Sequence, residues 1–504
     1  MKYVLSVDIG TTAIKGALVG SDGRIYGSAV SEYPLLTRPT GEVEQDIGVY
    51  EGAFRQAIAG AVSSAGANAS EIACIGLSAT GETVVFMDQD GNSLRNVMTW
   101  MDTRSLEEAA YLSSLFPREE LLRRTGAPSI RPSYLASKIL WVKRHEPAIF
   151  ARTKTFALIK DYFIYKLSGA CVSEDSLMCD AGCWDIPTRS YWGGMLAVLG
   201  IREGQLPRVV EPGTELGAIT ERAAAEYGLA PGTRVNVGGM DQACGAIGAG
   251  NIRPGTASES TGSALVAVFI SDRFRYDPSG ALPMFCAGLP RQFMFQPFST
   301  GAIIMKWYRD QFCREEREAA AAAGVSAYQL IDREVEQVPA GSEGLILLPF
   351  FQGSGSPEVN KRAKGVYYGI TAAHTRAHFG RAIMEGLAMA LRRMVEAAGP
   401  LGAQAAEIRS LGGGAKSGVW CQIKADVLGI PVKVVAGSEN TACMGAAMLA
   451  GAAVGMWPSV QHAVDKFVSI SEVYLPNPAV SPVYQKNYEK YLEISRALNH
   501  TFTG

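Results

Sequence analysis

The chain has 504 residues, of which 47% are hydrophobic and 19% are charged, and its formal net charge is −2. This length and composition predict roughly two to four globular units with substantial cores, rather than one small fold or a disordered chain. A net charge this close to zero creates no strong positive potential that would attract a nucleic-acid backbone or an anionic membrane surface. We therefore expect neither partner.

The cysteines and the apolar stretches predict the cellular compartment of the protein. Its nine cysteines show no CxxC pattern and no Cys/His metal spacing, which is typical of reduced thiols. The first residues enter a strand pattern without a signal-peptide leader. The most apolar later stretch, Cys443–Trp457, is shorter than the roughly 20 residues that span a bilayer. We therefore predict a cytoplasmic protein.

The first eighty residues alternate between strand and helix patterns. Apolar runs on both sides of Gly10, the second of them Ile14–Val19, predict a β-hairpin, and residues 23–35 predict a third strand. Apolar residues at helical spacing follow over residues 46–66, and Ile72–Leu77 has the pattern of a buried strand. This order predicts a mixed α/β layer structure.

The middle of the chain is first helical and then repeats the strand pattern. Residues 137–169 have a helical period that Pro147 interrupts. Residues 227–270 predict a turn at Pro231–Gly232, a strand to Val237, a Gly-rich turn, a small-residue helix and two more strands. Residues 457–504 are more polar, and we predict a helical tail packed on the rest.

A faint internal repeat indicates duplication. Asp8 precedes the turn Gly10–Thr12, and Asp241 precedes the turn Ser260–Ser263, so each half places an acid and a Gly-hydroxyl turn near strand ends. We interpret this as an internal duplication with a boundary near residue 250. Two facing copies would form a ligand cleft at their interface.

The first of these turns has the residues that a phosphate site needs. Gly10 lets a ligand approach the backbone N–H groups, and the hydroxyls of Thr11 and Thr12 can bind phosphate oxygens. Asp8 could hold a hydrated Mg²⁺, which takes few carboxylates. The alternative is a plain hairpin with a capping Asp.

No P-loop and no dinucleotide fingerprint occurs in the chain, so a nucleotide must be held in another way. Gly412–Gly414 follows a short apolar run and precedes an amphipathic helix, and a backbone bared of side chains there could lie against adenine or ribose. Tight packing is the alternative reason for such a turn.

Asp241 is the candidate base. It follows Gly238–Gly239 and precedes a small-residue helix, which would expose its carboxylate beside a helix N-terminus. Transfer of a phosphoryl group to an alcohol needs positioning, neutralised charge and a carboxylate that accepts the hydroxyl proton. A helix-capping role is the alternative.

Over nearly its whole length the sequence resembles the FGGY family of carbohydrate kinases. The resemblance is most specific in "GVYYGITAAHTRAHFGRAIME", where ten positions fit the family's C-terminal signature: Gly365, Tyr367, Gly369, Ile370, His378, Phe379, Ala382, Ile383, Met384 and Glu385. It implies an α/β fold of two ribonuclease-H-like (actin-like ATPase) domains with an interdomain cleft. We expect an N-terminal domain over 1–250, which binds the sugar, a nucleotide-binding domain over 251–456 and the tail over 457–504.

The resemblance also implies ATP-dependent phosphorylation of a sugar or polyol with Mg²⁺, and Asp241 stands at the position of the catalytic base. By the same comparison Asp8 resembles the magnesium-side acid. The residues that resemble the phosphate and adenosine segments are Gly10, Thr11, Thr12 and Lys15 for the first turn, Thr261, Gly262 and Ser263 for the second, and Gly413, Gly414, Ala415 and Asn440 for the adenosine.

A second family signature matches at Lys138, Trp141, Val142 and His145, whereas Leu135 stands where the pattern expects Pro, Ser or Thr. We interpret Lys138 and Trp141 as packing and surface residues rather than ligands.

For the acceptor site we predict Gly81, Glu82, Trp100, Asp102, Asp241 and Gln242. Xylulose and gluconate kinases of the family typically carry Met-His, and glycerol kinases Arg-Glu, where this chain has Gly81-Glu82. Trp100 could instead be structural, with Asp102 and Arg104 as an ion pair.

The sequence as a whole is most similar to the xylulokinase-like branch, so we expect a ketopentose such as xylulose as the acceptor. Gluconate, glycerol, a tetritol, or an actin-like switch ATPase remain alternatives. We expect a small-molecule partner and leave a homodimer open.

Overall fold

The computed structural model describes residues 1–502. They form two compact units, which are described separately below. The first unit comprises Met1–Ile252, Asp272–Met294 and Asn440–Val468, and the second comprises Arg253–Ser271, Phe295–Glu439 and the chain from Ser469 onward.

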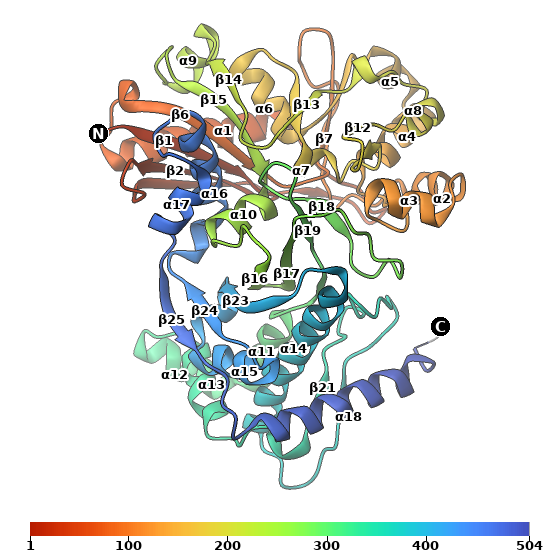
Figure 1. Ribbon diagram of the computed structural model, residues 1–504, viewed down its shortest axis with the longest axis vertical. Helices are drawn as coiled ribbons and strands as arrows, with labels where there is room; N and C mark the ends of the chain where they lie inside the picture. Colours follow the sequence, from red (N-terminus) through yellow and green to blue (C-terminus); the bar gives the residue numbers. More distant parts are fainter. Residues whose placement is uncertain (503–504) are drawn as a thin grey trace. The chain divides into compact units, whose positions relative to one another are not determined.

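A mixed sheet is the centre of the first unit (Figure 1). Strands β1 and β2 form the predicted antiparallel hairpin, β3 extends it as predicted, and β6 and β15 run parallel to β1 and to each other. The strands lie in the order β14-β15-β6-β1-β2-β3. Their bounds are β14 Glu215–Ala218, β15 Arg234–Met240, β6 Ile72–Ala79, β1 Tyr3–Ile9, β2 Ala13–Gly20 and β3 Ile25–Glu32.

Helices cover both faces of this sheet because its central strands are apolar on both sides. Leu5 and Val7 pack with α1, α6 and α9 on one face, whereas Val4 and Val19 pack with α10, α16 and α17 on the other. The bounds are α1 Ile47–Ala65, α6 Ile159–Ser168, α9 Glu221–Tyr227, α10 Asp241–Gly248, α16 Thr441–Ala453 and α17 Val460–Phe467.

The small residues of α10 and α16 bring these two helices close together. An added Cβ at Gly445 would lie 1.9 Å from the Cys244 carbonyl oxygen, and one at Gly248 would lie 2.0 Å from that of Thr441. Contacts this short leave no room for a side chain, which explains the Ala and Gly content of this apolar stretch. Among the described residues, no helix is both long and apolar enough to cross a membrane.

The second unit repeats the strand pattern of the first. Within its sheet, β25, β24, β23, β16 and β17 are neighbours in that order, and β20 also pairs with β17. Strands β16 and β17 form an antiparallel hairpin, and β23 and β24 run parallel to β16. The bounds are β16 Gly255–Thr261, β17 Ala264–Ser271, β20 Phe298–Thr300, β23 Ala405–Leu411, β24 Val432–Val435 and β25 Ile470–Tyr474.

This shared topology confirms the predicted duplication but corrects one part of it. The counterpart of the β1–β2 hairpin is β16–β17, so the second copy begins near Gly255. Asp241 follows β15, a strand of the first sheet. Asp8 and Asp241 are therefore not equivalent positions of the repeat, and both belong to the first unit.

A large hydrophobic cluster of the second unit joins its helices to strand β21 of a small two-stranded sheet. Buried residues of the long helix α14, among them Met384 and Leu387, pack with Trp420 of α15 and Tyr484 of α18. The bounds of the helices and of a small two-stranded sheet are α11 Ile303–Phe312, α12 Arg314–Ala323, α13 Ala327–Glu336, α14 Arg376–Ala398, α15 Gly418–Leu428, α18 Ser481–Asn499, β21 Ile346–Leu348 and β22 Val366–Tyr368.

Three predicted elements differ from the structure. The helical pattern after Pro147 is interrupted by strand β9, which pairs with β7. The strand predicted to end at Val237 continues to Met240, because Gly238 forms a bulge rather than a turn. The predicted helical tail contains α17 and α18, but it also supplies β25 to the second sheet.

The remaining elements of the first unit lie outside its main sheet. Their largest part is a sheet of order β4-β5-β8-β7-β9. The bounds are β4 Leu36–Thr37, β5 Val43–Gln45, β7 Val84–Met87, β8 Val97–Met98, β9 Thr155–Leu158, β10 Val172–Glu174, β11 Trp184–Asp185, β12 Ser190–Tyr191, β13 Arg208–Val210, β18 Met284–Cys286, α2 Leu106–Ser114, α3 Arg118–Thr125, α4 Leu135–His145, α5 Pro147–Arg152, α7 Asp175–Met178 and α8 Gly193–Leu199; β19 (Phe293–Phe295) lies at the boundary of the two units.

Candidate active site

The β1–β2 turn carries the first predicted phosphate segment. Asp8 is half-buried near the end of β1 and is paired with Lys15 of β2 in the strand register. Its Oδ1 accepts a hydrogen bond of 2.7 Å from the Ser78 hydroxyl. Burial raises the pKa of Asp8, although the Ser78 bond and the charge of Lys15 both lower it. A cation beside this carboxylate would offset the cost of its burial.

Gly10 gives this turn its shape. An added Cβ would lie 2.8 Å from the Ala13 carbonyl oxygen, which already accepts the Gly10 N–H at 3.0 Å. The Gly10 carbonyl accepts the Tyr33 hydroxyl at 2.6 Å. Thr11 is half-buried and Thr12 is exposed. The two threonines therefore lie at the accessible tip of an anchored turn.

One hydrogen bond connects a predicted acceptor residue with this turn. Trp100 is 42% exposed, and its indole Nε1 donates to Thr11 Oγ1 at 2.7 Å. Since the Thr11 oxygen accepts this bond, the hydroxyl can donate its own hydrogen to another group, such as a phosphate oxygen. The structure thus brings a predicted acceptor residue and the first phosphate turn together within one unit.

Asp241 is the first residue of α10 and is half-buried. Its Oδ1 accepts the backbone N–H of the neighbouring Gln242, also half-buried, at 2.5 Å. Burial is the main cause that raises the pKa of Asp241 to about 7, and the charges of Asp8 and Glu82 add to the effect. A carboxylate with a pKa near neutrality is suited to act as a general base.

The bulge in β15 sets the direction in which Asp241 leaves the sheet. Gly238 has a φ of 62°, and a Cβ there would lie 1.6 Å from the Leu77 carbonyl oxygen. No side chain fits in this space, so only glycine allows the strand to bulge against β6. The register shift lies between Asn236 and Gly239, directly before Asp241.

A buried ion pair supports the residue before Asp241. Lys160 Nζ and Glu174 Oε1 lie 2.5 Å apart, and both side chains are fully buried. Glu174 accepts the backbone N–H of Ser176 at 2.6 Å, and the Ser176 hydroxyl accepts the backbone N–H of Met240 at 2.9 Å. This chain of contacts fixes the main chain at the start of α10.

The predicted acceptor segment Gly81-Glu82 holds an acid in an uncommon conformation. Glu82 has a φ of 58°, in the left-handed region, and its side chain is buried. Glu82 Oε1 accepts the Ser133 hydroxyl at 2.7 Å, and its carbonyl accepts Lys138 Nζ at 2.6 Å. Lys138 is fully buried, so the interpretation of this lysine as a packing or surface residue was incomplete.

Three residues that sequence reasoning missed surround Glu82. Burial and then the charge of Glu82 raise the pKa of Asp180 well above its usual range, whereas Arg131 acts to lower it. The Arg131 guanidinium lies 5.6 Å from the centre of the Tyr134 ring. Arg131 and Asp180 lie outside helices and strands, where periodicity gives no signal. The one sequence feature that could have indicated a role in the site is the charge of each residue among small and apolar neighbours.

Asp102 is not open to a ligand. Its side chain is fully buried, and its Oδ2 accepts Arg104 Nη2 at 2.7 Å and the Val43 backbone N–H at 2.8 Å. Arg104 Nε also donates to both oxygens. The carboxylate therefore connects β5 with the segment after β8, and we leave Asp102 out of the acceptor site proposed below.

In the second unit the structure brings the second phosphate turn together with the Gly-rich segment. Gly414 lies so close to Thr261 that an added Cβ would be 2.6 Å from the Thr261 Cβ. Gly262 and Ser263, at the tip of the β16–β17 turn, are half-buried and exposed. Gly413 is exposed, whereas Gly414 and Ala415 are buried in the 3-10 turn η5 (Gly413–Lys416).

A fully buried acid, Glu259, binds the threonine of this turn. Glu259 Oε2 accepts the Thr261 hydroxyl at 2.6 Å, and its Oε1 lies 2.6 Å from Lys424 Nζ of α15 and also accepts the Ser410 hydroxyl. The Thr261 hydroxyl already donates its hydrogen to Glu259. A ligand at this turn would therefore find the backbone N–H groups and Ser263 rather than that hydroxyl.

Asn440 is the one predicted adenosine residue that the structure assigns to the first unit. It is half-buried at the N-cap position of α16, where no side-chain capping bond forms. Gly413, Gly414 and Ala415 belong to the second unit.

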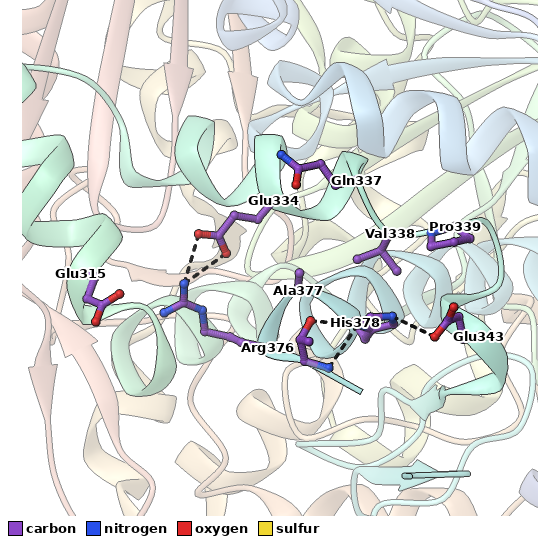
Figure 2. Close-up of a pocket in the computed structure, with 10 residues that line it drawn as sticks. Glu315, Glu334, Gln337, Val338, Pro339, Glu343, Arg376, Ala377 and His378 are labelled. Atoms are coloured by element: carbon purple, nitrogen blue, oxygen red, sulfur yellow. Dashed lines mark hydrogen bonds and ion pairs between the residues drawn. The ribbon is translucent and has the colours of Figure 1, made fainter. Parts of the chain in front are cut away.

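A hollow of about 580 Å³ in the second unit contains none of the predicted site residues (Figure 2). Two ion pairs line it: Arg376 bonds to Glu334 at 3.1 Å, and His378 Nε2 lies 3.3 Å from Glu343. Because no residue of either phosphate segment lines this hollow, we assign it no ligand.

Comparisons with known proteins identify the family of the chain. Residues 3–248 match the N-terminal domain of the FGGY family of carbohydrate kinases, and residues 285–454 match its C-terminal domain. The chain belongs to the FGGY family of carbohydrate kinases. This FGGY kinase is 30% identical to a xylulose kinase of Bacillus subtilis, over 98% of this chain and 97% of the relative.

Two further matches have similar coverage. A gluconokinase of Bacillus licheniformis is 28% identical over 99% of this chain and 97% of its own length. The crystal structure of a xylulose kinase from Rhodospirillum rubrum superposes with a TM-score of 0.91 and 28% identity, over 99% of this chain and all of that one. These matches confirm the predicted family and the predicted two-domain, ribonuclease-H-like fold.

Proposed function

We propose that this FGGY kinase transfers the γ-phosphoryl group of ATP to a hydroxyl of a neutral sugar or polyol, with a ketopentose such as xylulose as the preferred acceptor. One observation carries the proposal. Asp241 has a pKa raised to about 7 and lies in the same unit as Asp8, close enough that the charge of Asp8 contributes to this rise. The Trp100–Thr11 bond adds a link between acceptor and phosphate segments.

In this proposal Asp241 accepts the proton of the attacking hydroxyl while the oxygen forms its bond to the γ-phosphorus and ADP leaves. Glu82, Trp100 and Gln242 hold the acceptor beside it, and Gly81 leaves room for the acceptor chain. The polar hydroxyls of a sugar suit the acids and the indole of this site better than an apolar molecule would.

The nucleotide is proposed to bind mainly on the second domain, 251–456, and the acceptor on the first, 1–250. The phosphates would meet Gly10, Thr11, Thr12 and Lys15 on one turn and Thr261, Gly262 and Ser263 on the other. Gly413, Gly414, Ala415 and Asn440 would hold the adenosine. The packing of Gly414 on Thr261 supports the joint use of the two segments of the second unit.

The residues present fit Mg²⁺. This ion is usually held by one or two carboxylates together with water and substrate phosphates, and among residues 1–502 no group of three or more metal-ligating side chains could hold an ion alone. Asp8, whose pKa is raised by burial, is the carboxylate of such a sparse donor set. When bound, the ion would neutralise charge on the transferred phosphoryl group.

The acids of the site argue against an anionic acceptor. Glu82 and Asp180 are both buried and close enough to interact, and the neighbouring Lys138 uses its N–H groups on main-chain carbonyls. A sugar acid would add a further negative charge here. The similarity to a xylulose kinase over the full chain supports a neutral keto sugar.

The test is acceptor-dependent release of ADP. Purified enzyme with Mg-ATP is incubated with pentuloses, hexuloses, tetritols, glycerol and gluconate, and ADP is followed by a coupled assay. We expect release with at least one ketopentose at ten times the rate without acceptor or more. Equal rates with and without every acceptor would contradict the proposal and favour a switch ATPase, and a preference for gluconate would contradict the neutral acceptor.

The raised pKa of Asp241 predicts a pH dependence. A base must be ionised to accept a proton, so activity is lost as the pH falls through the pKa. With a pKa of about 7, kcat/KM should be constant above about pH 8 and fall roughly tenfold per unit below pH 6.5. Initial rates between pH 5.5 and 8.5 in buffers of equal ionic strength measure this. A profile that stays flat down to pH 5.5 would rule out a base with this pKa.

A further inference from the structure

Lys138 of α4 is a fully buried lysine whose ammonium binds main chain only. Its Nζ donates to the carbonyl oxygens of Glu82 at 2.6 Å, Thr99 at 2.8 Å and Met98 at 3.4 Å. An ammonium group has three N–H donors and no acceptor, so these three carbonyls use its full capacity. Burying a charged lysine costs desolvation free energy, and the three hydrogen bonds offset part of this cost.

The carbonyls that Lys138 binds belong to the two segments of the proposed acceptor site. Glu82 lies in the turn between β6 and β7, and Thr99 directly precedes Trp100 after β8. One ammonium therefore joins the main chain that presents the Glu82 carboxylate to the main chain that presents the Trp100 indole. The two segments are joined by one antiparallel pair, Val84 of β7 with Met98 of β8, and the Lys138 ammonium extends this link to Glu82 and Thr99, which lie outside the strands.

The same helix end also fixes the Glu82 side chain. Ser133, just before α4, donates its hydroxyl to Glu82 Oε1 at 2.7 Å. Glu82 keeps a left-handed φ of 58°, which a non-glycine residue holds only where its surroundings impose it. The region around α4 thus binds both the main chain and the side chain of this residue.

The acids around Lys138 and the burial of its side chain act on its pKa in opposite directions. Glu82, Asp102 and Asp180 all act to raise its pKa, and Arg104 acts to lower it. Burial exceeds these effects and brings the pKa down to about 7. The ammonium form has one N–H for each of the three carbonyls, whereas the neutral amine keeps two.

We propose that Lys138 is a positioning residue that fixes the Glu82 and Trp100 segments in one geometry and thereby sets which acceptor the enzyme prefers. This inference rests on the proposed function for its kinetic consequence only. The expected signature is a change in acceptor KM and acceptor preference without a matching change in ATP binding.

The test compares Lys138→Met with Lys143→Met. Lys143 lies on the same helix and donates to a single carbonyl, that of Leu199, at 2.8 Å, so its variant controls for the loss of a lysine–carbonyl bond from α4. For Lys138→Met we expect acceptor KM to rise at least tenfold, the ratio of kcat/KM between a ketopentose and a tetritol to change at least fivefold, and KM for ATP to stay within twofold. For Lys143→Met all three should stay within twofold.

Hydrogen–deuterium exchange gives a readout that does not depend on activity. In Lys138→Met we expect faster exchange in peptides over 80–84 and 98–101 together, and in Lys143→Met no change there. An acceptor KM and preference like those of the wild type, or unchanged exchange in both segments, would overturn the inference. If Lys138→Met does not fold, Lys138→Gln, which keeps an amide donor, is judged by the same criteria. A wild type that phosphorylates no acceptor would refute the proposed function, and exchange would still decide the role of Lys138.

Discussion

Replacing Asp241 with Asn is expected to lower kcat for acceptor phosphorylation by about 10²- to 10⁴-fold, the range that a positioned general base contributes. Asn has nearly the same shape and can hold the same backbone contact with Gln242. Its amide, however, cannot accept the hydroxyl proton. KM for the acceptor should change by less than about fivefold, because the hydrogen-bonding surface remains.

Three measurements make this test specific: kcat and KM by a coupled ADP assay, acceptor binding by calorimetry, and thermal unfolding. Glu221→Gln is the matched control, since Glu221 is an exposed acid at the first position of another helix in the same unit. The Asn variant should unfold at no lower temperature than the wild type at pH 8, because it removes a charge whose burial raises the pKa of Asp241. Turnover within tenfold of the wild type would exclude Asp241 as the base.

Replacing Lys424 with Met is expected to destabilise the second unit by about 3–5 kcal/mol, the usual cost of leaving one partner of a buried ion pair uncompensated. Lys424 and Glu259 lie 2.6 Å apart with side chains 2% and 0% exposed. Without the ammonium, Glu259 either remains a buried lone anion or takes up a proton. Because Glu259 also accepts the Thr261 hydroxyl at 2.6 Å, the second phosphate turn should loosen and nucleotide affinity should fall.

The loss is measured by denaturant unfolding and by calorimetric titration with ATP. Lys433→Met is the matched control: Lys433 pairs with Glu407 in the same sheet, but the two side chains are 30% and 20% exposed, and pairs of this kind contribute about 0–1 kcal/mol. In the double variant Glu259→Gln/Lys424→Met, stability should return in part because no lone charge remains. A loss below about 1 kcal/mol for Lys424→Met would show that the pair does not support the turn.

Local patterns were sufficient to predict much of the fold. The apolar runs around Gly10, the helical spacing over 46–66 and the small residues after Cys443 each describe a single element, so periodicity and turn chemistry identify it. The β15 bulge could not be predicted in this way. Two glycines after an apolar run are typical of a turn, and only the approach of the Leu77 carbonyl, far away in the sequence, shows that the strand continues.

The residues of the candidate site also form two groups: those that local motifs predict and those whose roles depend on tertiary contacts. Asp8, Thr11 and Asp241 lie in short motifs whose residue order already indicates phosphate and proton chemistry. Asp102 has a motif of the same kind, yet its role is set by Arg104 and the distant Val43. Arg131 and Asp180 meet through tertiary contacts between irregular segments, and a single sequence contains no record of such contacts.

The Gly238 bulge has a consequence for attempts to change the acceptor by laboratory evolution. At Gly81 an added Cβ would have only ordinary contacts, 3.5 Å from Asp180 and Met240, so a library can vary that codon widely. At Gly238 the same atom would lie 1.6 Å from a carbonyl oxygen, and every substitution there would displace the residue that follows β15. Randomisation should therefore be concentrated on the loop and should leave codon 238 untouched.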